Sequence, residues 1–226
     1  MAEETKAAQR AVIVEFDFTA LDGAEILFGV AGKVLAAHGV ELTDKLEAAH
    51  LAGGSYQGAL AELYERVGKK GDAAKIAKEL DEAFRSALAE KAPAAVDAGF
   101  KAFVKALVDK DVKVVVDTRA PVEPIAAALA EFGEAVAVYG EQSLTYGSLK
   151  WDAWVRACRA NHLVAPLTVA VTGSGYGVRA ALIAGVAAVA VQSKRTHYQD
   201  FGGADVLVDK LDVKLVPEIL KSLHLA

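Results

Sequence analysis

The stretch Ala11–Gly23, AVIVEFDFTALDG, runs from an apolar segment into an acidic turn. Its residues 12–14 are Val, Ile and Val, and such a short β-branched run is typical of a strand buried on both faces of a parallel sheet. The carboxylates of Glu15, Asp17 and Asp22 follow directly. Because ligands of open parallel sheets bind beyond the carboxyl ends of the strands, this turn is the first candidate for a functional site.

The rest of the chain predicts a long helical region followed by alternating helices and strands. Apolar spacing and capping residues predict helices over residues 24–37, 43–51, 55–67, 72–91, 96–110, 122–132, 151–161, 176–184 and 216–223. The short apolar runs VKVVVD, AVAVYG, LTVAV, VAAVAV and DVLVD predict further strands. Fully apolar strands between helices indicate an α/β fold, a doubly wound, Rossmann-like parallel sheet. The helical region would be an insertion after the first strand.

Composition excludes several classes of function. The 226 residues carry 30 acidic and 25 basic side chains, a net charge of -5, and 54% are hydrophobic. The dispersed charges leave no basic footprint for nucleic acid. The longest apolar stretches, such as residues 180–191, are too short for membrane insertion. A lone Cys158 and no signal-like start predict an intracellular soluble protein, in the cytoplasm or in an organelle matrix or stroma.

The polar residues that follow the predicted strands are expected to converge at one edge of the sheet. Glu15 and Asp17 follow the first strand, Thr118 ends the second, and the turn TGSGYG, residues 172–177, follows a later one. Lys150 lies in a loop before a helix. Together Glu15, Asp17, Thr118 and Lys150 form a chemically suggestive set.

This series of features resembles the haloacid dehalogenase (HAD)-like superfamily, in the branch of phosphoglycolate phosphatase and β-phosphoglucomutase. The resemblance covers nearly the whole chain. It implies a HAD-like core formed by residues 1–22 and 96–226. It also implies a helical cap, residues 23–95, inserted between the first and second motifs.

The first family motif is Asp-x-Asp-Gly-Thr, and EFDFT places Glu15, Asp17 and Thr19 on its key positions. The resemblance implies that Glu15 stands where the family has its nucleophile and Asp17 where it has its acid/base. Thr19 is retained for phosphate binding. Two positions depart from the pattern, because Glu15 replaces an aspartate and Phe18 a glycine.

The later motifs are matched in part. The resemblance assigns phosphate binding to Thr118, which closes the second strand, and to Lys150. Arg119 stands where asparagine is frequent. In the fourth motif, TGSGYG, Thr172, Gly173 and Ser174 occupy the turn, and no carboxylate is present to complete a magnesium site.

These departures predict a catalytically inactive or strongly impaired homologue that acts as a binding, regulatory or assembly subunit without a cofactor. Magnesium needs near-octahedral oxygen ligands, and an attacking carboxylate misplaced by ~1 Å can lose about a hundredfold in rate. The alternative is an active Mg-dependent phosphatase or phosphomutase, in which Glu15 and Asp17 would hold the metal. The expected partners are a protein or a phosphorylated small molecule.

Other interpretations of single features stay open at this point. The glycines of TGSGYG could present backbone N–H groups to an anion without a metal, with Lys150 as the counter-charge. The same turn is a weak match to a dinucleotide fingerprint. Cys158 and His162 are four residues apart on a predicted helix, so they could face the same side. A packing role suits this pair better than a catalytic role. Trp151 and Trp154 pack or form an exposed patch, and Glu15 and Asp17 could simply cap the first turn.

Overall fold

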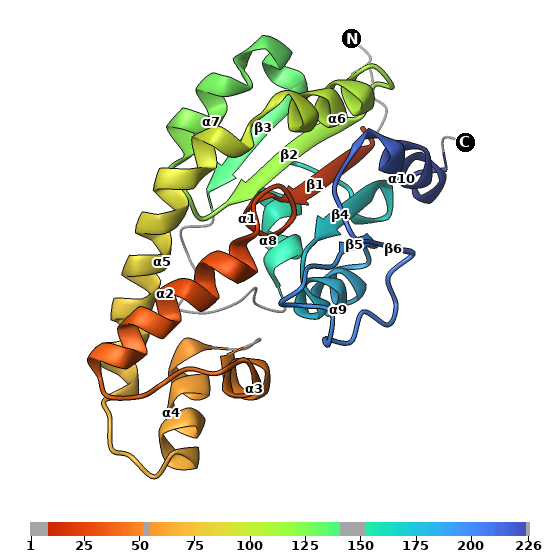
Figure 1. Ribbon diagram of the computed structural model, residues 1–226. Coiled ribbons are helices and arrows are strands. Elements are labelled where there is room, and N and C mark those ends of the chain that lie inside the picture. The colour runs from red at the N-terminus through yellow and green to blue at the C-terminus, as the bar shows by residue number, and fades with distance from the viewer. Residues whose placement is uncertain (1–8, 52–54, 141–151, 225–226) are drawn as a thin grey trace.

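The computed structural model describes residues 9–51, 55–140 and 152–224 of the chain. They form a six-stranded sheet with helices on both faces and a helical extension at one end (Figure 1). The strand order is β3-β2-β1-β4-β5-β6, and all the pairings are parallel. The prediction of a doubly wound, Rossmann-like α/β fold is therefore confirmed.

Each of the predicted apolar runs forms a strand. The strands are β1 (Ala11–Glu15), β2 (Lys113–Thr118), β3 (Val136–Gly140), β4 (Thr168–Thr172), β5 (Ala187–Val191) and β6 (Val206–Val208). All residues of β1 are buried, as expected for a strand with neighbours on both sides and helices on both faces. The chain reverses its winding direction between β1 and β4, where the order changes from descending to ascending. A crevice at the carboxyl ends of these strands is the usual ligand site in such sheets.

The helices follow the predicted order, apart from the added turn α1 and three differences in extent. They are α1 (Phe16–Thr19), α2 (Gly23–Ala37), α3 (Asp44–Leu46), α4 (Tyr56–Arg66), α5 (Ala73–Ala95), α6 (Ala98–Val108), α7 (Val122–Ala128), α8 (Ala153–Ala160), α9 (Gly175–Ala184) and α10 (Val216–Ser222). The helix predicted over 43–51 is split, because α3 passes into a π-helical turn, η1 (Glu47–Leu51). The helix predicted over 122–132 is split as well, because α7 is followed by a 3₁₀ segment, η2 (Ala130–Ala135). Helix α5 continues past Lys91 through Pro93, since Ala92 still lies on its buried stripe.

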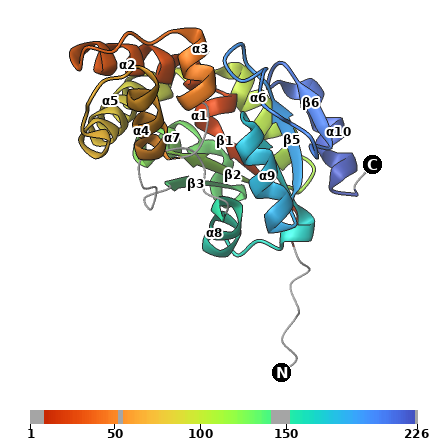
Figure 2. The same cartoon turned by 90° about the horizontal axis from the view of Figure 1, so that it is seen from below.

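Alternate side chains of the strands enter two different hydrophobic clusters. Val12 and Val14 pack in a cluster with residues of α5, α6 and α10. Ile13 points the opposite way, into a cluster with α8 and α9. Figure 2 shows these helices on the two sides of the sheet. Trp154 of α8 is fully buried, and its indole Nε1 donates to the carbonyl of Gly177 at 2.8 Å. It packs, as expected; Trp151 lies outside the described residues.

The inserted helices contribute a third cluster of their own. We use the name cap for residues 23–95, the division that the sequence predicts. Residues of α2, α4 and α5, among them Leu35, Leu60 and Leu80, form this cluster. Helix α5 takes part in two clusters, because Leu80 packs in the cap while Phe84 packs in the core. Figure 1 shows α2 and α5 running together from the sheet towards α4.

Candidate functional site

The polar residues predicted to converge do meet at the carboxyl end of β1. Glu15 is the register partner of Asp117 on β2, so the two side chains leave the same face of the sheet. Thr172 ends β4, the neighbour of β1 on the other side. Asp17 lies on α1, the single turn that follows β1. Glu15, Asp17, Asp117 and Thr172 are all buried.

Glu15 is bound from one side by the fourth-motif turn. Its Oε2 accepts hydrogen bonds from Thr172 Oγ1 at 2.5 Å and from the backbone N–H of Gly173 at 2.9 Å. Burial raises the pKa of Glu15 from 4.5 to about 7, against the lowering effect of these two bonds. The residue therefore keeps a proton further up the pH scale than an exposed glutamate does. It is also more than a cap for the first turn, because its side chain joins β1 to the end of β4.

Asp17 is bound from the other side by the end of β2. Thr118 Oγ1 donates to Asp17 Oδ1 at 2.6 Å, and the backbone N–H of Arg119 donates to Oδ2 at 2.7 Å. Thr118 Oγ1 accepts in turn from the N–H of Ala120 at 3.0 Å. Burial raises the pKa of Asp17, although both hydrogen bonds favour its charged form. Asp17 and Thr118 are thus brought together as predicted, and each carboxylate oxygen of Asp17 accepts a bond from this strand end.

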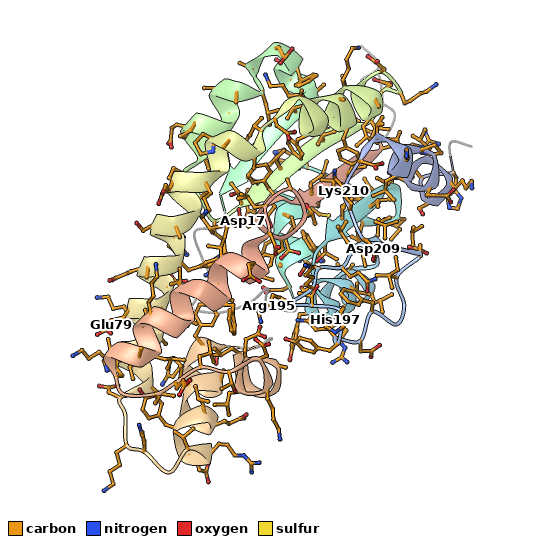
Figure 3. All side chains as sticks on the ribbon, viewed as in Figure 1. Asp17, Glu79, Arg195, His197, Asp209 and Lys210 are labelled. Carbon is orange, nitrogen blue, oxygen red and sulfur yellow. The ribbon has the colours of Figure 1, made fainter. Side chains whose placement is uncertain are left out.

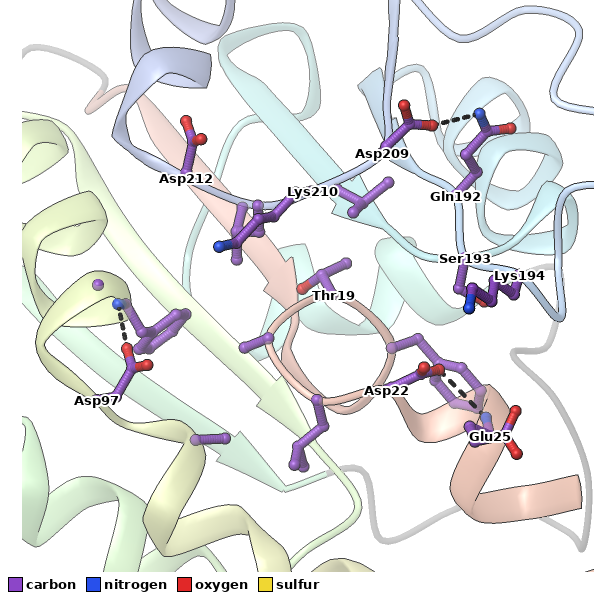
Figure 4. A pocket seen from close by; sticks show the side chains of 18 of the residues that line it. Thr19, Asp22, Glu25, Asp97, Gln192, Ser193, Lys194, Asp209, Lys210 and Asp212 are labelled. Carbon is purple, nitrogen blue, oxygen red and sulfur yellow. Dashed lines mark hydrogen bonds between the residues drawn. The ribbon is translucent and has the colours of Figure 1, made fainter. Parts of the chain in front are cut away.

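Thr19 and Lys150, the other predicted phosphate ligands, do not join this pair in the described residues. The hydroxyl of Thr19 donates to the backbone carbonyl of Glu15 at 2.8 Å. Thr19 lines a cleft of about 1070 Å³ between α1, the start of α6 and the loops after β5 and β6 (Figure 4). Thr118 instead lines a separate pocket of about 460 Å³. Lys150 lies outside the described residues.

The N–H groups of the fourth-motif turn already have acceptors within the protein. Gly173 N–H donates to Glu15 as described, and Gly175 N–H donates to Gln199 Oε1 at 2.8 Å. Gly177 N–H donates to Ser174 Oγ at 3.1 Å, so Ser174 caps α9. The hypothesis that these glycines present free donors to an anion is therefore wrong. The local reason is that a carboxylate, an amide and a hydroxyl of the same protein reach the turn first.

A close approach between two backbone segments requires glycine at position 173. A Cβ there would lie 2.3 Å from the carbonyl oxygen of Phe18 and 2.6 Å from its Cβ. Both distances are far below van der Waals contact. The Phe18 ring packs against Phe84 of α5, with 6.1 Å between the centroids. The chain path of α1 thus occupies the space in which a carboxylate side chain from position 173 would have to stand.

The donor set does not fit a magnesium ion of the kind that the resemblance implies. Within residues 9–51, 55–140 and 152–224, no group of three His, Cys, Asp or Glu side chains could hold a metal ion. Asp117 lies beside Glu15 in register but does not complete such a group. Magnesium requires several oxygen ligands in near-octahedral geometry. Both oxygens of Asp17, and Oε2 of Glu15, already accept hydrogen bonds.

Arg119 is a site residue whose role the sequence did not reveal. Its side chain is 7% exposed and reaches out of the core into the cap, where Nη2 pairs with Asp81 Oδ1 at 2.5 Å. The guanidinium lies 5.5 Å from the ring centroid of Phe84 and 3.5 Å, by Nη1, from the hydroxyl of Tyr56. Its Nε is buried and has no hydrogen-bond partner in the part of the chain that the structure describes. The only sequence signal was an arginine where the motif favours asparagine.

Two other candidate features are structural. Cys158 is buried on α8, where burial raises the pKa of its thiol, whereas His162 is exposed after the end of the helix. The pair does not share a face, so the packing interpretation holds. Gly177 is required by packing too, since a Cβ there would lie 1.8 Å from Thr172 Oγ1. The glycines of GSGYGV thus have a local reason that is unrelated to a dinucleotide.

Comparisons with known proteins identify the fold. No protein-family model and no curated protein matches the chain. A β-phosphoglucomutase from Clostridium difficile matches with a TM-score of 0.70 and 15% identity, over 96% of this chain and 97% of that one. CbbY from Rhodobacter sphaeroides, in complex with phosphate, matches with a TM-score of 0.62 and 21% identity, over 92% of this chain and 96% of that one. A HAD family hydrolase from Deinococcus radiodurans with bound phosphate and sodium matches with a TM-score of 0.59 and 19% identity, over 96% of this chain and 97% of that one.

The chain therefore has the HAD-like fold of these proteins, as the resemblance predicted. In addition, none of the helices among the described residues is long and apolar enough to cross a membrane.

Proposed function

We propose that this protein uses the HAD-like fold without its phosphatase chemistry, as a catalytically inactive or strongly impaired homologue that serves as a binding, regulatory or assembly subunit. The observation that carries the proposal is the contact between Gly173 and Phe18. Because the Phe18 carbonyl lies 2.3 Å from where a Cβ would stand, a fourth-motif carboxylate has no room at this position. The chain thus departs from the family pattern in the path of its backbone at Phe18 as well as in the identity of residue 173.

The state of the two remaining carboxylates supports the same conclusion. In-line attack on phosphorus needs an ionised nucleophile held by a metal against the phosphoryl group. The pKa of Glu15 is raised to about 7 by burial, and its Oε2 is held by Thr172 and Gly173. Asp17 is held at both oxygens by the end of β2. These bonds stabilise the fold and hold both carboxylates against donor groups of the neighbouring strand ends.

The alternative is an active Mg-dependent phosphatase or phosphomutase that acts on a small phosphorylated metabolite. The convergence of Asp17 with Thr118, at 2.6 Å, favours it, since both residue types match the family motifs. In that case Glu15 would attack phosphorus, Asp17 would serve as acid/base, and Thr118 with Lys150 would hold the phosphate.

Phosphate release separates the two functions. The native chain and Asp17→Asn are assayed with an aryl phosphate and a panel of phosphorylated metabolites, with and without Mg²⁺. We expect the two chains to release phosphate at the same background rate. Magnesium-dependent turnover in the native chain that Asp17→Asn abolishes would establish the phosphatase instead. Asp22→Asn, which changes the residue that N-caps helix α2, is a matched control for the loss of an acidic side chain.

The binding role predicts a protein partner, and the exposed apolar residues of α9 are where we would test it. Leu182 and Ile183 are 53% and 61% exposed. Adjacent exposed apolar residues of this size are commonly found at interaction sites. We expect affinity purification from the native source to recover a stoichiometric companion that is lost in a Leu182→Lys and Ile183→Lys double variant. Val164→Lys, at a residue 44% exposed, is the control and should retain it.

A phosphorylated small molecule is the second candidate ligand. Two of the similar structures hold phosphate, and a CbbY variant is described in complex with xylulose-(1,5)bisphosphate. Titration calorimetry of the native chain with inorganic phosphate and with sugar phosphates, in the absence of Mg²⁺, tests whether such binding persists. Binding that Thr118→Val weakens would assign the ligand to this end of the sheet.

A further inference from the structure

The cap contacts the core through two ion-pair clusters that lie on opposite sides of β1. The inner latch consists of Arg119, which follows β2, with Asp81 and Arg85 of α5. The outer latch consists of Arg195, which follows β5, with two cap carboxylates, Glu25 and Asp44. In both clusters a core loop supplies a guanidinium that binds carboxylates of the cap. In the sheet order β2 lies on one side of β1, and β5 lies on the other side, beyond β4, so the two latches hold the cap from both sides.

The inner latch is almost completely buried. Arg119 Nη2 lies 2.5 Å from Asp81 Oδ1, and the two side chains are 7% and 5% exposed. Asp81 Oδ2 also binds Arg85 Nε at 2.8 Å, so one carboxylate joins two guanidinium groups. Separating the cap from the core would leave the Arg119 guanidinium without its carboxylate partner, while Asp81 would keep Arg85. Breaking a buried pair in this way is much more costly than breaking an exposed one.

The outer latch combines charge with ring stacking. Arg195 Nε lies 2.8 Å from Glu25 Oε2, and Arg195 Nη1 lies 2.6 Å from Asp44 Oδ1. The guanidinium carbon is 3.5 Å from the ring centroid of Phe28, which lies on α2. The Arg195 side chain is 19% exposed. Figure 3 shows Arg195 where the loop after β5 meets α2, apart from Asp17.

Helix α5 is a continuous connection between the cap cluster and the core cluster. It runs unbroken from Leu80, which packs in the cap cluster, to Phe84 and Leu88, which pack in the core cluster. A hinge within this segment would have to unwind α5 or pull Phe84 out of the core. The packing of α5 in both clusters therefore also opposes separation of the cap from the core.

We propose that the two latches and α5 hold the cap closed over the carboxyl end of β1, so that Arg119 seals Asp17 from solutes in the resting protein. The seal is an autoinhibitory contact, because any group that acts on Asp17 must first separate Arg119 from Asp81. This inference is independent of the proposed function, since it concerns access to the site whether or not the site is catalytic.

Amide hydrogen exchange of residue 119 measures the seal directly. Its N–H donates to Asp17 Oδ2 and lies outside any helix, so it exchanges only when the site opens. We expect it to exchange at least about a thousandfold more slowly than an unprotected amide in the native chain. Exchange near the unprotected rate would overturn the proposal.

Removal of the outer latch distinguishes cap opening from local loosening. In Arg195→Gln the change lies in another loop, yet residue 119 should exchange roughly fivefold faster, as expected for loss of a partly exposed ion pair. The matched control is Arg179→Gln, which breaks an ion pair with Asp200 inside the core. It should leave the exchange of residue 119 unchanged. Equal rates in these two variants would overturn the proposal.

The inner latch is tested by Arg119→Met, which keeps the length and removes the charge. Asp81 retains Arg85 as a partner in this variant, so the chain should fold. We expect the amide of residue 119 to exchange at least about tenfold faster, since the buried pair contributes more than the outer one. If Arg119→Met does not fold, the Arg195→Gln result alone decides. An unchanged rate in a folded Arg119→Met chain would contradict the seal.

Discussion

Glu15 offers a direct test of the site, because its carboxylate is buried and both of its hydrogen-bond donors, the hydroxyl of Thr172 and the backbone N–H of Gly173, are uncharged. Burial raises its pKa from 4.5 in the unfolded chain to about 7 in the folded protein. A raised acid pKa means that the folded state favours the protonated form. The stability that this provides is complete below pH 4.5 and is lost as the pH rises towards 7.

The substitution Glu15→Gln removes this titration while keeping the size of the side chain. The free energy of unfolding of the variant, minus that of the native chain, should therefore grow with pH. The two pKa values give an increase of about 2 to 3 kcal/mol between pH 5 and pH 8, since each pKa unit corresponds to 1.36 kcal/mol. Any fixed effect of the amide group cancels, because only the change with pH is compared.

Urea unfolding of both chains at pH 5, 6, 7 and 8 provides the measurement. The control is Glu134→Gln, which removes an exposed carboxylate and should give a difference that stays flat over the same range. A flat difference for Glu15→Gln as well would refute the reasoning, because it would mean that Glu15 titrates alike in the folded and unfolded chains. A difference that falls with pH would show that the folded site favours the charged carboxylate.

Two further substitutions probe the same end of the sheet by urea unfolding. Thr118→Val removes the donor to buried Asp17 and should destabilise the chain by about 1 to 3 kcal/mol, the cost of leaving a buried acceptor without its donor; a loss below ~0.5 kcal/mol would contradict the short bond. Gly173→Ala should cost about 3 kcal/mol through its contact with Phe18, whereas Gly29→Ala, where nothing lies within 4 Å, should stabilise α2 by about 0.5 to 1 kcal/mol. Equal effects at the two glycines would show that α1 can move aside.

Much of the fold could be predicted from local patterns. The valine-rich runs predict strands because β-branched residues suit a buried sheet, and all of them form strands in the structure. The meeting of Asp17 and Thr118 could also be predicted, since parallel strands end at a common edge. The predicted role of Thr19 as a phosphate ligand stays untested, although its recorded bond goes to the backbone of Glu15.

What the sequence could not reveal depends on contacts between distant segments. The 2.3 Å approach of Phe18 to position 173 joins a turn after β1 to a turn after β4, and no spacing rule predicts it. The reach of Arg119 into the cap depends on where α5 places Asp81. An arginine after a strand looks like a solvated loop residue until the helix that covers it is known. Both contacts act through backbone paths that long-range packing determines.

These contacts change how the loss of the family's acids should be understood. Restoring acids alone, as Glu15→Asp with Gly173→Asp, would place a side chain against the carbonyl oxygen and Cβ of Phe18. Replacing Phe18 by glycine removes only the Cβ contact, and the backbone oxygen at 2.3 Å stays. The added freedom of glycine would have to let α1 shift as well. We therefore expect no magnesium-dependent phosphate release from the double variant, and any gain from a triple variant with Phe18→Gly requires movement of α1. Turnover in the double variant would show that the acids were the only missing part.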